Sequence, residues 1–256
     1  MTAQDEPLVV VEGLAKSYGG VRAVDGVSFA IPRGSLTGMI GPNGAGKSTV
    51  LGMIAGAIRP DRGSIVLDGR EIAGLPSHRV ARLGVIRTFQ AASVFPRMTV
   101  LENLLLGVPP WWGEGIAPAL FARPRWRSQE REQVQRARGL LDRLGLSSMA
   151  DTYAGQLSGG QKRLVEIGRA MMARPKLLLL DEPMAGVSRT LAPAIEALVA
   201  ELRQDGMTVL LIEHELALVE RLCSPVVVLA QGRVLHRGEM AEARANPEVR
   251  RAYLVG

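Results

Sequence analysis

A glycine-rich segment at Gly41–Ser48 constrains the fold of this chain more than any other feature of its sequence. Its residues, GPNGAGKS, fit the pattern G-x-x-x-x-G-K-[ST] in full, and they lie between an apolar, strand-like run at Ser35–Ile40 and a helix-like segment at Ser48–Ala57. Glycines let the backbone curl so that several N–H groups converge on one anion, and the positive end of the following helix faces the same anion. The segment therefore predicts a strand, a loop and a helix that bind the phosphates of a nucleotide.

Each residue type in this loop has an expected part in phosphate chemistry. The ammonium group of Lys47 would reach the β- and γ-phosphates, and the hydroxyl of Ser48 would bind Mg²⁺. A chance glycine turn before a helix is the alternative, and the full match in this context argues against it. The residues expected to contact the nucleotide are Gly41, Pro42, Asn43, Gly44, Ala45, Gly46, Lys47, Ser48 and Thr49.

Apolar runs of strand length alternate with helix-like segments over much of the chain, which indicates an α/β protein with a largely parallel sheet. Two earlier strand-like segments are separated by a turn at Gly19 and Gly20. The expected strands outside the phosphate loop are Leu8–Glu12, Val24–Ile31, Leu177–Leu180, Met207–Ile212 and Val226–Ala230.

The middle of the chain, from about residue 88 to residue 160, has a different pattern. It is helical and loop-like, has few β-branched runs and contains Trp111, Trp112 and Trp126 among several arginines. We interpret residues 88–160 as a helical subdomain inserted into an α/β core formed by residues 1–87 and 161–256. The tryptophans are more simply core residues of this subdomain, and the alternative places them near lipid headgroups, since Trp favours interfaces.

Composition excludes several classes of protein. Hydrophobic residues make up 47% and charged residues 22% of the 256 residues, as in globular rather than disordered chains. No apolar run approaches the roughly 18 residues that span a membrane, and the polar N-terminus MTAQDEP gives no indication of a signal peptide. The single cysteine, Cys223, fits a reducing compartment. The net charge of +6 suits nucleic acid, anionic lipid or phosphate ligands without choosing among them.

Two acids, Asp181 and Glu182, directly follow the apolar run Leu177–Leu180. A strand that ends in this way places them at the carboxyl edge of the sheet, where ligands bind in open α/β folds. Asp181 would hold Mg²⁺ through its water shell, and Glu182 would polarise the attacking water as general base. Alone, the pair could be a solvated strand end, but with the phosphate loop it completes a magnesium–nucleotide site.

A second glycine motif, LSGGQ at Leu157–Gln161, precedes another helix-like segment. It offers a hydroxyl and two glycine amides at a helix N-terminus, which is a second place for an anion. One chain needs only one phosphate loop, so the motif suggests that two chains share each nucleotide. By itself the motif is weak, because Ser-Gly-Gly is also a common turn.

With Gln90 after Phe89 and His214 after an apolar strand, these motifs resemble the ATP-binding cassette family of transporter ATPases over nearly the whole chain. The segments IRTFQAASVFPRMTVLENLLLG (86–107) and IEHELALV (212–219), and the ending RRAYLVG, resemble the branched-chain amino acid importer branch. The resemblance implies a single ABC ATPase domain over residues 1–256. Its α/β fold would be a P-loop NTPase core with a mostly parallel sheet, an N-terminal antiparallel β portion and an inserted α-helical subdomain.

The resemblance also implies roles for individual residues. Tyr18 would stack on adenine, Gln90 would couple the helical subdomain to the nucleotide, and His214 would bond to the γ-phosphate and Glu182. Taken alone, Tyr18, Gln90 and His214 would each more often be structural or solvated residues. The implied catalytic residues are Glu182, His214 and Gln90, the metal-binding residues are Ser48, Gln90 and Asp181, and the contacts with ATP bound by a partner are Ser158, Gly159, Gly160 and Gln161.

The resemblance further implies ATP and Mg²⁺ as cofactors and several protein partners. These are a second ABC ATPase subunit, identical or paralogous, an integral membrane permease docking near residues 88–107 and, indirectly, a periplasmic or extracellular solute-binding protein. Nucleic acid is not expected as a partner. The chain would lie peripherally on the cytoplasmic face of the inner membrane. Ser188 stands where the family has Asp or Asn, which puts strict alternation of the two ATP sites in doubt.

Other functions of such a cassette stay open from the sequence. Urea import and lipopolysaccharide export use closely similar ATPases, and the long basic segment between Gln90 and Leu157 favours the amino acid branch over them. A cassette acting in translation or DNA repair is the alternative from another class. It is disfavoured because translation factors usually carry two cassettes and repair ATPases carry long coiled coils, whereas this chain has one cassette and no sustained heptads.

Overall fold

The computed structural model describes residues 7–88, 93–109 and 123–254, without the side chains of residues 123–127 and 254. The chain divides into two compact units. The first unit comprises Met1–Gln90, Pro175–Ala185 and Val199–Gly256, and the second comprises Ala91–Arg174 and Gly186–Leu198.

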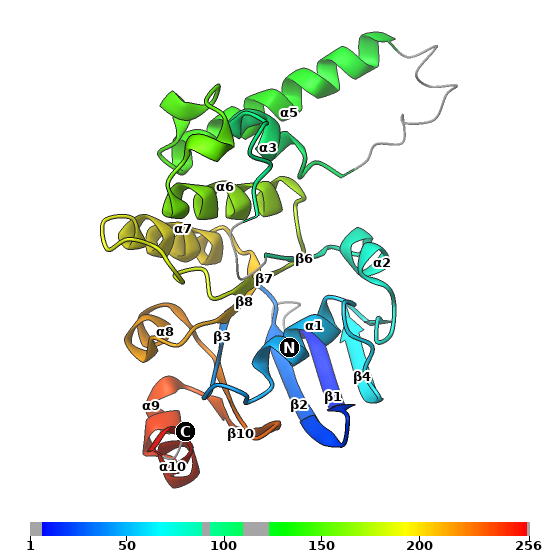
Figure 1. Ribbon diagram of the computed structural model, residues 1–256. Helices are drawn as coiled ribbons and strands as arrows, with labels where there is room; N and C mark the ends of the chain where they lie inside the picture. Colours follow the sequence, from blue (N-terminus) through cyan, green and yellow to red (C-terminus); the bar gives the residue numbers. More distant parts are fainter. Residues whose placement is uncertain (1–6, 89–92, 110–122, 255–256) are drawn as a thin grey trace. The chain divides into compact units, whose positions relative to one another are not determined.

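An antiparallel sheet forms the N-terminal part of the first unit (Figure 1). Its strand order is β2-β1-β4-β5, and every neighbouring pair is antiparallel. The chain reverses between the first two strands at Gly19 and Gly20, whose φ angles of +51° and +87° favour glycine. The predicted turn and antiparallel portion are therefore confirmed. The strands are β1 (Pro7–Tyr18), β2 (Val21–Pro32), β4 (Arg62–Leu67) and β5 (Arg70–Glu71).

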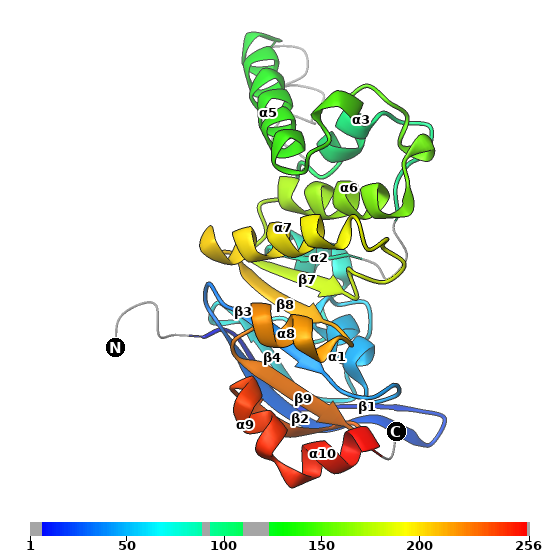
Figure 2. The same cartoon turned by 90° about the vertical axis from the view of Figure 1, so that its left-hand side faces the viewer.

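A second sheet of the same unit carries the strands that precede the candidate site. Its order is β10-β9-β3-β8-β7-β6, and all neighbours are parallel except β9 and β10. Figure 2 shows β7 and β8 running in the same direction. Strands buried on both faces read as continuous apolar runs, which is why the sequence revealed them. The strands are β3 (Leu36–Ile40), β6 (Val85–Arg87), β7 (Leu177–Asp181), β8 (Thr208–Ile212), β9 (Val226–Ala230) and β10 (Arg233–Gly238).

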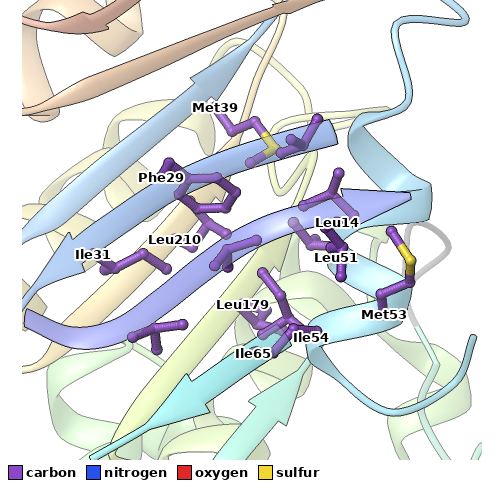
Figure 3. Packing of buried hydrophobic residues seen from close by; sticks show 14 of the residues in the cluster. Leu14, Phe29, Ile31, Met39, Leu51, Met53, Ile54, Ile65, Leu179 and Leu210 are labelled. Carbon is purple, nitrogen blue, oxygen red and sulfur yellow. The ribbon is translucent and has the colours of Figure 1, made fainter. Parts of the chain in front are cut away.

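Helix α1 (Lys47–Ile54) belongs to the hydrophobic core of the first unit. Figure 3 shows side chains of α1 and of both sheets packed together, among them Leu51, Phe29 and Leu179. Leu51 is fully buried, as are its helix neighbours Val50 and Ile54. Packing along its length therefore fixes the position of the helix that follows the phosphate loop, and this also fixes the C-terminal end of the loop.

Shorter helices cover other parts of the first unit. Helix α8 packs closely on β3 at Gly38. A Cβ on this glycine would lie only 2.8 Å from Val219 Cγ1, so the close approach requires a residue without a side chain. Helix α9 packs against β9 and α10 packs against α9 (Figure 2), and both helices also contact β10. Among the described residues, no helix is long and apolar enough to cross a membrane. These helices are α2 (Ser77–Arg82), α8 (Leu216–Leu222), α9 (Met240–Ala245) and α10 (Pro247–Leu254).

The second unit is helical where it is described. Thr99 and Glu102 form a capping box at the start of α3. On α6, Gly168 has no side chain and so leaves room for the side chains of Leu104 and Leu144. Helix α7 (Ala192–Gln204) begins in this unit. Trp111, Trp112 and the side chain of Trp126 lie outside the described residues. The other elements are α3 (Val100–Leu105), α5 (Arg123–Arg143), the 3₁₀ turns Ser147–Met149 and Ala154–Gln156, and α6 (Gly159–Met172).

The second unit extends beyond the range 88–160 expected from the sequence. It includes α6, which the sequence boundaries assign to the α/β core, because α6 packs on α3 and α5. It also includes Gly186–Leu198, whose Val187 and Leu191 approach Gly160 at the start of α6. The fold class itself, an α/β core with a largely parallel sheet, an antiparallel portion and a helical part, is confirmed.

The position of α1 in the core predicts a large effect of Leu51→Ala. Deleting this buried side chain should lower the free energy of unfolding by about 2–5 kcal/mol, because transfer and cavity terms add. Urea denaturation followed by circular dichroism measures it. Val21→Ala is the control, since Val21 is 69% exposed and its truncation should change stability by less than about 0.5 kcal/mol. Equal midpoints for the two variants would contradict the core assignment.

Candidate functional site

The phosphate loop holds a backbone conformation that only glycine supports at two positions. Gly41 has φ +154°, and a Cβ there would collide with the carbonyl oxygen of Leu229 in β9. Gly46, the N-cap of α1, has φ +99°, and a Cβ there would lie 2.5 Å from the carbonyl oxygen of Ala23 in β2. The loop is therefore tightly packed against strands of both sheets, and its glycines are required by space as well as by torsion.

Lys47 is the first residue of α1 and is only 5% exposed. Its Nζ donates to the carbonyl oxygens of Gly41 at 2.7 Å and Pro42 at 3.0 Å, so its ammonium group lies against the loop. Burial lowers the pKa of Lys47 from its ordinary value, and the negative charges of Glu182 and Asp181 oppose that shift. The geometry places a cation where the sequence predicts phosphate.

Asp181 ends β7, and its side chain is 3% exposed. Its Oδ2 accepts a hydrogen bond of 2.7 Å from Nη2 of Arg87, the last residue of β6. Its Oδ1 is buried and has no hydrogen-bond partner among the described residues. A buried carboxylate oxygen without a partner is a suitable acceptor for the water shell of Mg²⁺, and the Ser48 hydroxyl, exposed at the start of α1, is a second hard oxygen donor. The donor set therefore fits this ion.

Glu182 and His214 contact each other at 2.7 Å, through Oε1 and Nε2 respectively. Glu182 has φ +49°, which is uncommon for a residue with a side chain, and its N–H donates to the carbonyl oxygen of Ile212 at 3.0 Å. The loops after β7 and β8 are thus held together at the carboxyl edge of the sheet, as the sequence predicts for the acids. The strained backbone of Glu182 fits a functional position.

Glu213 supports the same pair of loops and was not foreseen from the sequence. It is 5% exposed, and its carboxylate accepts from the backbone N–H of Met184 at 3.0 Å and of His214 at 3.3 Å. Burial raises the pKa of Glu213, while these backbone hydrogen bonds oppose the shift. Its place beside His214, at the end of an apolar strand, was the one signal available.

A cavity of about 410 Å³ brings several predicted residues together. Tyr18, which is 48% exposed at the end of β1, lies on its lining with Glu182 and His214. Gly41, Pro42 and Asp181 are not part of this lining, although they adjoin it in sequence. Gln90 lies outside the described residues. The lining consists of Tyr18, Ala23, Asn43, Gly44, Ala45, Gly46, Lys47, Ser48, Thr49, Glu182 and His214.

The LSGGQ residues lie at the start of α6 in the second unit. Ser158 is the N-cap, and it forms a capping box with Gln161: Oγ accepts from the Gln161 N–H, and Gln161 Oε1 accepts from the Ser158 N–H at 2.9 Å. A Cβ on Gly160 would lie 2.7 Å from Leu191, whereas one on Gly159 would make only an ordinary contact of 3.9 Å with the carbonyl oxygen of Gly186. The backbone carbonyl oxygen of Ser188 accepts from the N–H groups of Leu191 and Ala192, which stabilises the turn before α7.

Fold and site together define a P-loop nucleotide-binding protein, and comparison with known proteins shows its family. The family described as ABC transporter matches residues 24–185. The chain is 43% identical over 249 residues to the high-affinity branched-chain amino acid transport ATP-binding protein BraF of Pseudomonas aeruginosa, covering 97% of this chain and 98% of that protein. It is 39% identical over 250 residues to the protein of the same description, LivG, of Escherichia coli K12, covering 97% and 98%.

A solved structure of similar sequence has the same fold. The ADP conformation of MJ1267, an ATP-binding cassette of an ABC transporter, superimposes with a TM-score of 0.83 and is 38% identical, covering 97% of this chain and 99% of that one. The chain therefore belongs to the ABC transporter family, as an ATP-binding, ATP-hydrolysing component.

The position of Lys47 predicts that Lys47→Met weakens ATP binding. Loss of a hydrogen bond to a charged group should raise the dissociation constant about 10- to 100-fold. Isothermal titration calorimetry with ATP measures it. Lys176→Met is the matched control, because Lys176 is half-exposed and pairs with Asp68 through Nζ at 2.5 Å, away from the cavity lining. Undiminished affinity in Lys47→Met would contradict the assignment of this loop to phosphate.

Proposed function

We propose that this chain is the ATP-hydrolysing subunit that powers uptake of branched-chain or related amino acids through a separate membrane permease. One observation carries the proposal: relatives named as high-affinity branched-chain amino acid transport ATP-binding proteins match 97% of the chain at 39–43% identity. Similarity over the whole length includes the segment between Gln90 and Leu157, which favours the amino acid branch among related cassettes.

The geometry of the first unit supports a hydrolytic role for this chain's own residues. The carboxylate of Glu182, held by His214 at 2.7 Å, would accept the proton of the attacking water, and Lys47 would offset the charge that develops on the γ-phosphate. Mg²⁺, when bound, supplies further charge neutralisation, and Ser48, Asp181 and Gln90 would hold it. Tyr18, exposed at the rim of the same cavity, would stack on the adenine.

Two cassettes would complete each ATP site. Ser158, Gly159, Gly160 and Gln161 of one chain would contact ATP bound by the phosphate loop of the other, identical or paralogous, chain. Binding of ATP would then favour the closed dimer and hydrolysis would reopen it. Gln90 and the segment 88–107 would transmit this motion to the permease. A periplasmic or extracellular protein would deliver the solute, and the chain would lie on the cytoplasmic face of the inner membrane.

The proposed base predicts that Glu182→Gln separates binding from hydrolysis. Its ATPase rate should fall about 10²- to 10⁴-fold, because the amide cannot accept the proton, while ATP affinity is retained. Phosphate release and calorimetry measure the two properties, and size-exclusion chromatography with ATP should show a trapped dimer. Glu215→Gln is the control. Glu215 follows His214 in the chain and is exposed, so this variant should hydrolyse ATP normally. A wild-type rate in Glu182→Gln would show that another group is the base.

The proposed substrate class predicts a transport phenotype. Deletion of the gene in its source organism should reduce high-affinity uptake of radiolabelled leucine, and the wild-type gene should restore it. The Glu182→Gln gene should not, because transport depends on hydrolysis. Uptake of urea, measured in the same strains, should be unchanged. Normal leucine uptake in the deletion strain, or loss of urea uptake alone, would contradict the assignment to amino acids.

A further inference from the structure

Arg87 is a partly buried cation at the candidate site that the proposed function does not use. It ends β6, where its backbone pairs with Leu179 of β7, and its side chain is 20% exposed. The strand places it beside Asp181, which lies two residues further along β7. The Nη2 to Oδ2 distance of 2.7 Å is that of a short, charge-assisted hydrogen bond.

The contact uses one nitrogen of Arg87 and one oxygen of Asp181. Arginine and carboxylate often pair through two parallel hydrogen bonds, which would occupy both oxygens. Here Asp181 Oδ1 and Arg87 Nε are both buried and have no hydrogen-bond partner among the described residues. One carboxylate oxygen is thus anchored, and the other stays available for a further ligand.

Arg87 lies beside helix α1. Gly52 is buried on α1, and a Cβ there would lie at an ordinary contact distance, 3.6 Å, from Arg87 Nη1. The guanidinium group therefore lies near the helix that begins with Lys47 and Ser48. Its planar shape and fixed donor directions suit it to orient a carboxylate, which a flexible lysine does less well.

We propose that Arg87 is a positioning residue, which anchors Oδ2 of Asp181 so that Oδ1 is presented to the divalent cation of the nucleotide site. The inference rests on the proposed function, because that function assigns Asp181 to Mg²⁺. Residues that orient metal-binding carboxylates typically contribute 10- to 100-fold to metal affinity, according to general experience with such outer contacts.

Loss of the Arg87 charge and loss of its anchoring contact are expected to change cation affinity in opposite directions, which makes the inference testable. Removing a positive charge beside Asp181 would make the site more negative and would strengthen binding of a cation. Removing an anchor would instead let the carboxylate turn away or find another partner, and cation binding would weaken. The sign of the change in affinity therefore distinguishes positioning from simple electrostatics.

Titration of Mn²⁺ into the purified chain with ADP, followed by the electron paramagnetic resonance signal of free Mn²⁺, measures this sign. Arg87→Met should raise the dissociation constant for Mn²⁺ about tenfold or more, and Arg87→Lys should recover part of that loss. ADP affinity in EDTA should match the wild type, because no cation takes part there. Unchanged or tighter Mn²⁺ binding in Arg87→Met would overturn the proposal.

Control variants separate the possible failures. Arg33→Met removes another Arg–Asp pair, with Asp68 at 2.6 Å on the surface, and should leave Mn²⁺ binding unchanged. Asp181→Asn should weaken Mn²⁺ binding; if it does not, the metal assignment in the proposed function is wrong. If Asp181→Asn weakens binding and Arg87→Met does not, only the role of Arg87 fails. Arg87→Gln takes the place of Arg87→Met, with the same expected sign, should the latter not fold.

Discussion

The packing of the phosphate loop against neighbouring carbonyl groups is the constraint on which the rest of the site depends. Gly41 faces the carbonyl oxygen of Leu229, and Gly46 faces that of Ala23, so the loop has no room for side chains at either point. The helix that follows is buried in the core of the first unit. A backbone held at both ends in this way keeps its N–H groups in place before any ligand arrives, which reduces the ordering that binding requires.

The same core determines where the acids lie. Strands β7 and β8 are parallel neighbours, with Asp181 paired to Ile212, so both end at one edge of the sheet. The loops that follow are joined by the contact of Glu182 with His214 and by the hydrogen bond from Met184 to Glu213. Lys47 therefore lies near negative charges whose positions are fixed, and these charges partly offset the lowering of its pKa by burial. Binding of phosphate would add negative charge beside Lys47 and further favour its protonated form.

The sequence was sufficient to predict those parts of the molecule whose conformation depends on residues close together in the chain. The phosphate loop, the buried strands and the turn at Gly19 and Gly20 have short-range signals of composition and torsion. Arg87 had no such signal, and Glu213 had only its position beside His214, because the roles of both depend on which strands are neighbours: β6 lies beside β7, and β7 beside β8. The grouping of α6 with the second unit likewise depends on non-local packing, of Gly168 on Leu104 and Leu144.

In the LSGGQ segment, the residues that begin helix α6 can also be residues that bind a ligand. Ser158 caps α6 by accepting the Gln161 N–H, but a hydroxyl also has a proton to donate. The first N–H groups of a helix lack partners within it, and Gly159 is exposed, so its amide can still face an anion. The cap fixes the rotamer of Ser158 and orients that hydroxyl. The requirement to begin a helix well therefore also prepares the residues that would contact phosphate on a second cassette.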